Sequence, residues 1–234
     1  MSIVSSAILA DLAQVEAQRQ ARAADPLLRQ RVLLLKDYQQ QRFARTHADL
    51  IEDKRFAPAA RFFLEDLYGP QDFSRRDAQF ARVVPALVRL FPREIVATVQ
   101  MMSSLHALSE RLDNVTAGHL PGGPVQAGDY VRAWQATAEL PARTRQIDCV
   151  VQVGRQLQRY TRSLMLRQSL RLMRKPAQAA GLADLQRFLE RGFDIFAGLS
   201  QSDRFLELLE QRERALLHRL FAPDALAGAT GELP

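Results

Sequence analysis

The stretch RTRQIDCVVQVGRQLQRYTRSLMLRQSLRLMRK, residues 143–175, has the apolar spacing of an amphipathic helix. At about 100° per residue, five apolar side chains fall on one arc of that helix. They are Val150, Leu157, Leu164, Met165 and Leu172. Most arginines of the stretch lie away from this arc. The pattern therefore predicts a helix with an apolar core side and a cationic outer side, with Gly154 as its weak point.

Positive charge is concentrated in the same stretch. Eight arginines and Lys175 stand against one acid, Asp148, which gives a net charge of +8. The whole chain of 234 residues carries only +6, so the remainder sums to −2. A local excess of this kind indicates a partner for the basic side of the helix, inside the protein or outside it.

Three interpretations of the basic stretch remain open. In the first, the arginines are solvated or pair with acids of the last two helices, such as Glu190, Asp194 and Glu210. In the second, they bind a polyanion such as nucleic acid, although no helix-turn-helix or zinc spacing accompanies them. In the third, the helix lies on a membrane surface, although it lacks Trp and Phe. The arginines concerned are Arg155, Arg159, Arg162, Arg167 and Arg171.

Outside this stretch the pattern is also helical, because apolar residues recur at spacings of three and four and never alternate over a strand length. An all-α bundle of eight or nine helices is predicted, in one domain over 1–234. A Gly/Pro-rich loop at 118–128 separates two sub-bundles, at about 1–117 and 129–222, and 223–234 form a flexible tail. The expected helices are 3–23, 26–53, 58–68, 74–91, 92–117, one from 129, 141–175, 182–199 and 202–221.

Local signals refine several helix ends. Asp25 and Asp129 each precede a helix and are predicted to cap it. Ser74 followed by Asp77 resembles a capping box, with Asp where Glu or Gln is usual. Pro85 falls inside the helix 74–91 and predicts a kink or a split there, since proline removes a backbone hydrogen bond.

The least generic string is FFLEDLYGP at 62–70, followed by DFSRRD at 72–77. Together with LSERLD at 108–113 and FLERGF at 188–193, it resembles a family of uncharacterised bacterial all-helical proteins. The resemblance covers most of the chain. It implies a helical fold and no known activity, so it carries over no catalytic residue.

Two roles are open for this motif. Phe62, Phe63 and Phe73 are most simply core residues, and each stabilises the fold by roughly 1.5–3 kcal/mol when buried. Alternatively, the polar residues of the motif form an exposed aromatic and acidic patch that docks a partner protein. The residues of that candidate surface are Tyr68, Asp72, Arg76 and Asp77.

Catalytic signatures are missing from the sequence. The four histidines form no HExxH or Glu-x-x-His pattern. The single cysteine, Cys149, excludes CxxC sites and lies in an apolar run, which predicts a small buried thiol. The glycines of 118–128 lack the following Lys-Ser/Thr of a phosphate loop. Neither an enzyme activity nor a cofactor is expected.

One polar stripe on the helix 92–117 is a weak candidate for a ligand site. Met102, His106, Ser109 and Asp113 share one side of the helix, and Glu110 lies one turn after the histidine. His106 could serve in a metal or small-ligand site, or as an axial haem ligand. The alternative is a half-buried histidine that bonds to its own helix neighbours.

The sequence therefore favours a non-enzymatic interaction protein, acting through an unknown protein partner or as a homodimer. Ligand binding at His106 is one alternative, and nucleic-acid binding through 143–175 is another. A cytoplasmic location is expected from the single cysteine and from an N-terminus that does not resemble a secretory signal. No stretch approaches 18 apolar residues without charge, so no membrane span is expected.

Overall fold

The computed structural model describes residues 2–67 and 73–227. All regular structure in that part of the chain is helical, which confirms the all-α prediction. A π-helical turn, η1 (Phe63–Leu67), follows α4. The α-helices are α1 (Ile3–Ala24), α2 (Pro26–Thr46), α3 (Ala48–Glu52), α4 (Ala57–Phe62), α5 (Ser74–Leu90), α6 (Arg93–Gly118), α7 (Ala127–Thr137), α8 (Leu140–Thr161), α9 (Leu164–Leu172), α10 (Arg174–Ala179), α11 (Ala183–Gly198) and α12 (Ser202–Leu220).

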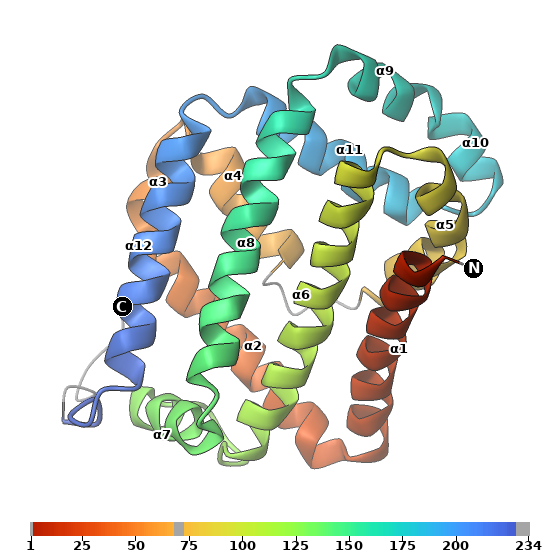
Figure 1. Ribbon diagram of the computed structural model, residues 1–234. Coiled ribbons are helices and arrows are strands. Elements are labelled where there is room, and N and C mark those ends of the chain that lie inside the picture. Colours follow the sequence, from red (N-terminus) through yellow and green to blue (C-terminus); the bar gives the residue numbers. More distant parts are fainter. Residues whose placement is uncertain (1, 68–72, 228–234) are drawn as a thin grey trace.

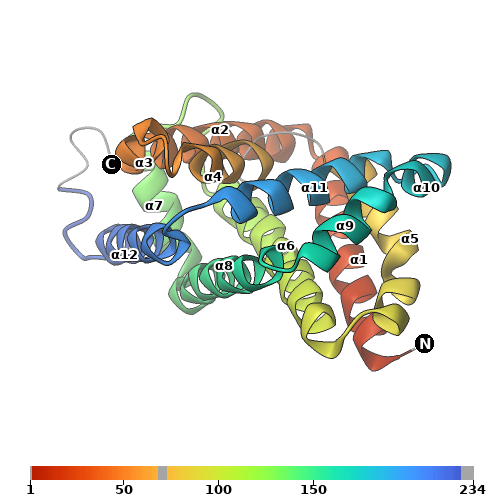
Figure 2. The ribbon, with the colours of Figure 1, turned by 90° about the horizontal axis from the view of Figure 1, so that it is seen from above.

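The helices form two layers. Helices α1, α6, α8 and α12 lie side by side in one layer, and α2, α3, α4 and α11 form the other (Figures 1 and 2). Contacts of α2 with α6 and of α11 with α8 join the layers. Helices α9 and α10 lie at one end of the bundle, where α9 packs chiefly against α8, α10 and α11 (Figure 1).

The core combines residues from both sides of the 118–128 segment. Its aromatic cluster packs Phe43 and Phe56 with Phe196 and Phe205. Phe62 and Phe63 join this cluster and are each 3 % exposed, so the core role predicted for them is confirmed. A second cluster surrounds Tyr130 and Trp134 with leucines of α12. Helices distant in sequence therefore share the same buried apolar surface.

Gly154 lies at a close contact between α8 and α12. A Cβ atom at this position would lie 2.6 Å from Cδ2 of Leu206, a side chain that is 1 % exposed. The prediction of a weak point at Gly154 was wrong, because α8 passes through it unbroken. The glycine instead allows close packing of the two helices.

More helices are present than the eight or nine predicted, because two long segments are divided. The segment 26–53 breaks at His47, whose Nε2 lies 2.9 Å from Oε1 of Glu213. The basic segment breaks at Arg162–Ser163 and again at Met173. Ser163 caps α9, since its Oγ accepts a hydrogen bond from the Leu166 amide at 3.3 Å.

One predicted helix cap in this part of the chain is confirmed, and a second predicted cap and the predicted split were wrong. Asp25 caps α2 as predicted, accepting hydrogen bonds from the Leu27 and Leu28 amides at 2.9 and 3.0 Å. The capping role of Ser74 was wrong, because the N-cap of α5 is Phe73, which makes no side-chain cap. Helix α5 also continues through Pro85 without a split.

Helix α7 begins before the predicted cap at Asp129. Its N-cap is Gln126, and Asp129 lies inside the first turn, where Oδ2 accepts a hydrogen bond from the Gln126 amide at 3.1 Å. The residues Gly69 and Pro70, and the tail from 228 onward, lie outside the described residues. Within 2–67 and 73–227, no helix combines the length and the apolar character that crossing a bilayer requires.

Candidate functional site

Asp77 of α5 joins three helices through its buried carboxylate. Nε2 of His106 on α6 lies 2.8 Å from Oδ2, and the Arg19 guanidinium on α1 donates to the same oxygen. Nε of Arg76 lies 3.5 Å from Oδ1. Arg76 and Asp77, which the sequence placed in one candidate surface, therefore meet His106, which it placed in another candidate site, in one cluster.

The surroundings of Asp77 stabilise its charged form. Burial alone would raise the pKa of this carboxyl. The hydrogen bond and charge of His106, the hydrogen bond of Arg19 and the charge of Arg76 outweigh burial and lower the pKa to about 2. Asp77 is therefore an anion at neutral pH, surrounded by cationic groups.

Arg76 connects the same cluster to α11. Its guanidinium lies 4.1 Å from the ring centre of Phe73 and 4.4 Å from that of Phe188, within cation–π range. The side chains of Arg76 and Asp77 are 16 % and 11 % exposed. These two residues face inward and do not contribute to an exposed patch. The other two residues of the candidate surface, Tyr68 and Asp72, lie outside the described residues.

The carboxylates of α6 that follow His106 interact with cationic side chains of other helices. Glu110 accepts hydrogen bonds from Lys36 Nζ at 2.7 Å and from Arg22 Nη2 at 2.5 Å. Burial opposes ionisation of Glu110, but Lys36 and Arg22 prevail and lower its pKa to about 2. Asp113, 3.8 Å from Lys36 Nζ, has a pKa raised by burial. Within 2–67 and 73–227, no three His, Cys, Asp or Glu residues are placed to hold a metal ion.

A third buried ion cluster lies between α2 and α12. Arg42 Nη1 and His47 Nε2 lie 2.5 and 2.9 Å from the same oxygen, Oε1 of Glu213. Burial would raise the pKa of Glu213, but Arg42 and His47 more than offset it and lower the pKa to about 2. The cluster fixes the end of α2 against the last helix.

The sequence pattern did not single out Arg19, Arg22 and Lys36 as partly buried cations or Arg42 as a buried one. A signal for the first two was nevertheless present. The buried residues Ile8, Leu12 and Val15 follow a spacing of three and four along α1, and Arg19 and Arg22 continue it. Two arginines at positions where apolar residues would be expected indicate buried carboxylates opposite them.

Several arginines of the basic segment pair with acids of α11 and α12. Arg155 lies 3.4 Å from Glu210, and Arg174 lies 2.8 Å from Glu190. Arg167 and Arg171 share one carboxylate, Asp194, at 2.9 and 3.7 Å. All these pairs are partly exposed, so each contributes little to stability.

Other cations of the segment have no ion pair among the described residues. Arg159, Arg162 and Lys175 are exposed and lack an acidic partner there. The acids of the described residues therefore neutralise the positive side of the segment only in part.

Helix α9 exposes the side chains that the sequence assigned to the core. Leu164 and Met165 are each 73 % exposed and Leu172 is 78 % exposed. None of the residues of α9 is buried. The core prediction was wrong for these three residues, because the arc was projected through a break in the helix. The turn at Arg162–Ser163 reorients α9 relative to α8.

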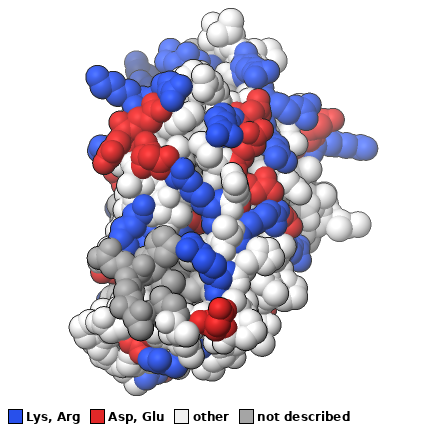
Figure 3. All heavy atoms as spheres, turned by 90° about the vertical axis from the view of Figure 1, so that its left-hand side faces the viewer, with Lys and Arg blue, Asp and Glu red and all other residues white. Residues whose placement is uncertain are grey.

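Charge is mixed elsewhere on the surface. Figure 3 shows the side of the molecule that carries α3 and α12, where blue and red side chains alternate over the described part. On these two helices, Arg212 pairs with Asp49 at 2.6 Å. Charge of one sign does not dominate this side as it does around α9.

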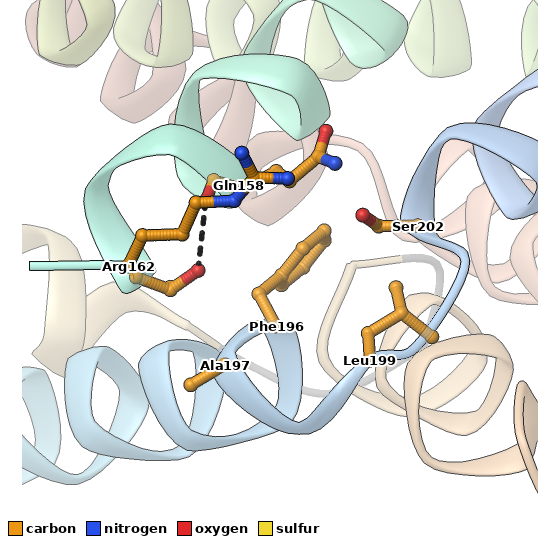
Figure 4. A pocket seen from close by; sticks show the side chains of 7 residues that line it. Gln158, Arg162, Phe196, Ala197, Leu199 and Ser202 are labelled. Carbon is orange, nitrogen blue, oxygen red and sulfur yellow. Dashed lines mark hydrogen bonds between the residues drawn. The ribbon is translucent and has the colours of Figure 1, made fainter.

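Two hollows adjoin α8. A pocket of about 110 Å³ lies between the end of α8, the end of α11 and the start of α12 (Figure 4). An open groove of about 430 Å³ lies between α6 and α8, and Cys149 lines it. The thiol is only partly buried, so the prediction of a buried cysteine was wrong. The groove also contains the polar side chains of Arg145 and Gln152.

Comparison with protein families shows where this arrangement belongs. Residues 18–226 match the model of a family described as Domain of unknown function (DUF8198). The chain belongs to this family. The matched part of this DUF8198 protein extends from the end of α1 past α12, so it contains all three ion clusters and α9. No match was found among curated proteins or among solved structures.

Proposed function

We propose that this DUF8198 protein is a non-enzymatic interaction module and that α9 binds an acidic, apolar surface of another protein. The α9 face is defined here as Leu164, Met165, Gln168 and Leu172. By helix geometry, these four side chains fall within about 100° of one another on α9. All four are exposed. We place the activity in the cytoplasm, where a free cysteine remains reduced.

The observation that carries the proposal is the exposure of three large apolar side chains on one short helix. A monomeric protein normally buries such residues, and a clustered exposed set marks an interaction site. Met173, 53 % exposed, follows directly and enlarges the patch. Burial of each side chain by a partner would contribute roughly 1.5–3 kcal/mol before the costs of association.

Charge around α9 indicates the kind of partner. The cations are Arg162, Arg167, Arg171, Arg174 and Lys175, and the acids paired with them are Asp194 and Glu190. Five positive charges against two negative ones leave a net charge of +3. A surface with Asp and Glu residues around apolar side chains complements this arrangement.

The same charge argues against pairing of two copies through this face. In a two-fold symmetric dimer the same patch meets itself, so the excess of positive charge would face a second excess. Nucleic acid would satisfy the charge but leave the apolar side chains without a partner. Ligand binding at His106 receives little support, because the ring is engaged by Asp77 at 2.8 Å.

A photo-crosslinking amino acid in place of Gln168 tests the proposal in cells of the source organism. The expected result is one crosslinked protein whose joined peptide, read by mass spectrometry, contains leucine or methionine together with Asp or Glu. The double change Leu164→Glu and Leu172→Glu should reduce the crosslink yield about tenfold or more, because it inserts like charges into the contact.

The matched control is Leu90→Glu, which alters a leucine of α5 that is 70 % exposed. The crosslink yield of this variant should equal that of the protein that carries only the crosslinker. A yield from the Leu164→Glu and Leu172→Glu variant equal to that of the same protein would overturn the proposal. A crosslink to a second copy, or binding only to vesicles of phosphatidylglycerol, would overturn it as well.

A further inference from the structure

The pocket at the start of α12 combines a polar rim with an apolar base. Phe196 and Leu199 form the base, and Gln158 and Arg162 extend over one side (Figure 4). Ser202 lies on the opposite side, and its hydroxyl points toward them. The volume of about 110 Å³ admits a small ion but not a nucleotide.

Helix α12 begins at this pocket without a side-chain cap. Gln201 is the N-cap residue, with a φ of 59°, and it makes no side-chain hydrogen bond to the helix. The first helical bond runs from the Phe205 amide to the Gln201 carbonyl at 3.1 Å. Within the described chain, the amides of residues 202–204 therefore lack acceptors. Such a helix start attracts anions.

The hydroxyl of Ser202 provides an independent indication of a ligand. Ser202 is 5 % exposed and lines the pocket. Its hydroxyl oxygen opens onto the pocket and has no hydrogen-bond partner among the residues that the structure describes. A polar group in this state can donate a hydrogen bond to an ion in the pocket.

Arg162 adds a full positive charge to the rim. This arginine forms no ion pair within 2–67 and 73–227, and it lines the pocket. Asp203 is also in the first turn, where it accepts a hydrogen bond from Gln158 Nε2 at 3.3 Å. The Asp203 side chain is exposed, so water and salt screen its charge.

We infer that this pocket binds a small oxyanion, a carboxylate or a phosphate group. Arg162 and the Ser202 hydroxyl donate to its oxygens, and the free amides at the start of α12 complete the site. The α9 face is not needed for this site, so the inference stands independently of the proposed function.

Nuclear magnetic resonance of the ¹⁵N-labelled full chain provides the test. Sodium acetate and sodium phosphate are titrated separately, with sodium chloride added to hold the ionic strength constant. Either ion should shift the amide signals of residues 202–204 with saturation. Saturation by acetate alone assigns a carboxylate, by phosphate alone a phosphate group, and by both a general oxyanion site.

Variants separate a built site from nonspecific attraction. Arg162→Gln should weaken binding about tenfold, as expected for loss of a charged hydrogen-bond donor, and Ser202→Ala should weaken it less. Arg159→Gln removes a nearby exposed arginine outside the pocket lining and should leave binding unchanged. The α9 double variant should also bind normally. Shifts that grow linearly, that sodium chloride reproduces, or that saturate with unchanged affinity in Arg162→Gln would overturn the inference.

Discussion

Single charged residues hold helices of this protein together from within. Asp77 is the clearest case, because its carboxylate receives Arg19 from α1 and His106 from α6. A buried ion has lost its hydration, and the attraction of its partner offsets this cost. Without the partner, the cost of desolvation remains. Removal of one member is therefore more damaging than loss of a surface pair.

Asp77→Asn tests this interpretation. The substitution keeps the size of the side chain but removes the negative charge that Arg19, Arg76 and His106 approach. The free energy of unfolding should fall by about 3 kcal/mol, measured by urea denaturation at neutral pH. Asp194→Asn, at a half-exposed carboxylate that pairs with Arg167 on the surface, is the control and should change stability little. Equal losses in both variants would contradict the buried role of Asp77.

At the scale of helices, the sequence pattern correctly predicted which segments are helical. It did not predict where long segments break or how the following helix is oriented. Apolar spacing correctly predicted that 143–175 is helical. The predicted apolar side, however, was projected over one continuous helix. The break at Arg162–Ser163 changed the orientation of everything after it, so Leu164 and Leu172 became exposed. A single serine cap is a weak signal in sequence, because serine is also common inside helices and on surfaces.

Gly154→Ala tests the contact between α8 and α12. The added Cβ would lie 2.6 Å from Leu206 Cδ2, and overpacking of a core contact costs about 1–3 kcal/mol. Alanine also improves helix propensity by about 1 kcal/mol, so the net loss of stability should be modest. In a Leu206→Ala background, which makes space, the same substitution should stabilise the protein. Thermal unfolding of the four proteins of this cycle measures the coupling, and strict additivity would contradict the close contact.

At the scale of the whole molecule, ion clusters connect segments far apart in sequence. Arg42 and Glu213 are separated by 171 positions. The spacing of apolar residues along one helix contains no information on such pairs. It shows which face of the helix an acid occupies, but not which distant cation the acid contacts. The candidate residues Arg76, Asp77 and His106 could therefore be selected from the sequence, but their common cluster could not.

Acid should destabilise the whole fold through three carboxylates. Asp77, Glu110 and Glu213 have pKa values of about 2 in the folded protein, below the roughly 3.9–4.3 of unfolded chains. Their stabilisation is present above the unfolded values and is lost as the pH falls from about 5 toward 2, on the order of 2 kcal/mol each. Asp113 offsets part of this loss, because burial raises its pKa.

Urea denaturation between pH 7 and pH 3 measures this dependence. The free energy of unfolding should decrease steadily below about pH 5. In Glu213→Gln, stability should be lower at pH 7 but should depend less steeply on pH, because one titrating group is gone. An unchanged slope in that variant would show that Glu213 does not couple folding to protonation.

Helix α9 has no buried side chains. Folding of the bundle therefore places few requirements on the sequence of α9. Substitutions on the outward side of this helix remove no core contact, so they carry little penalty for the rest of the molecule. Natural variation could therefore accumulate on α9 while the bundle beneath it stays constant. Under the proposed function, an engineered helix substituted at 164–172 would give the bundle a new binding specificity.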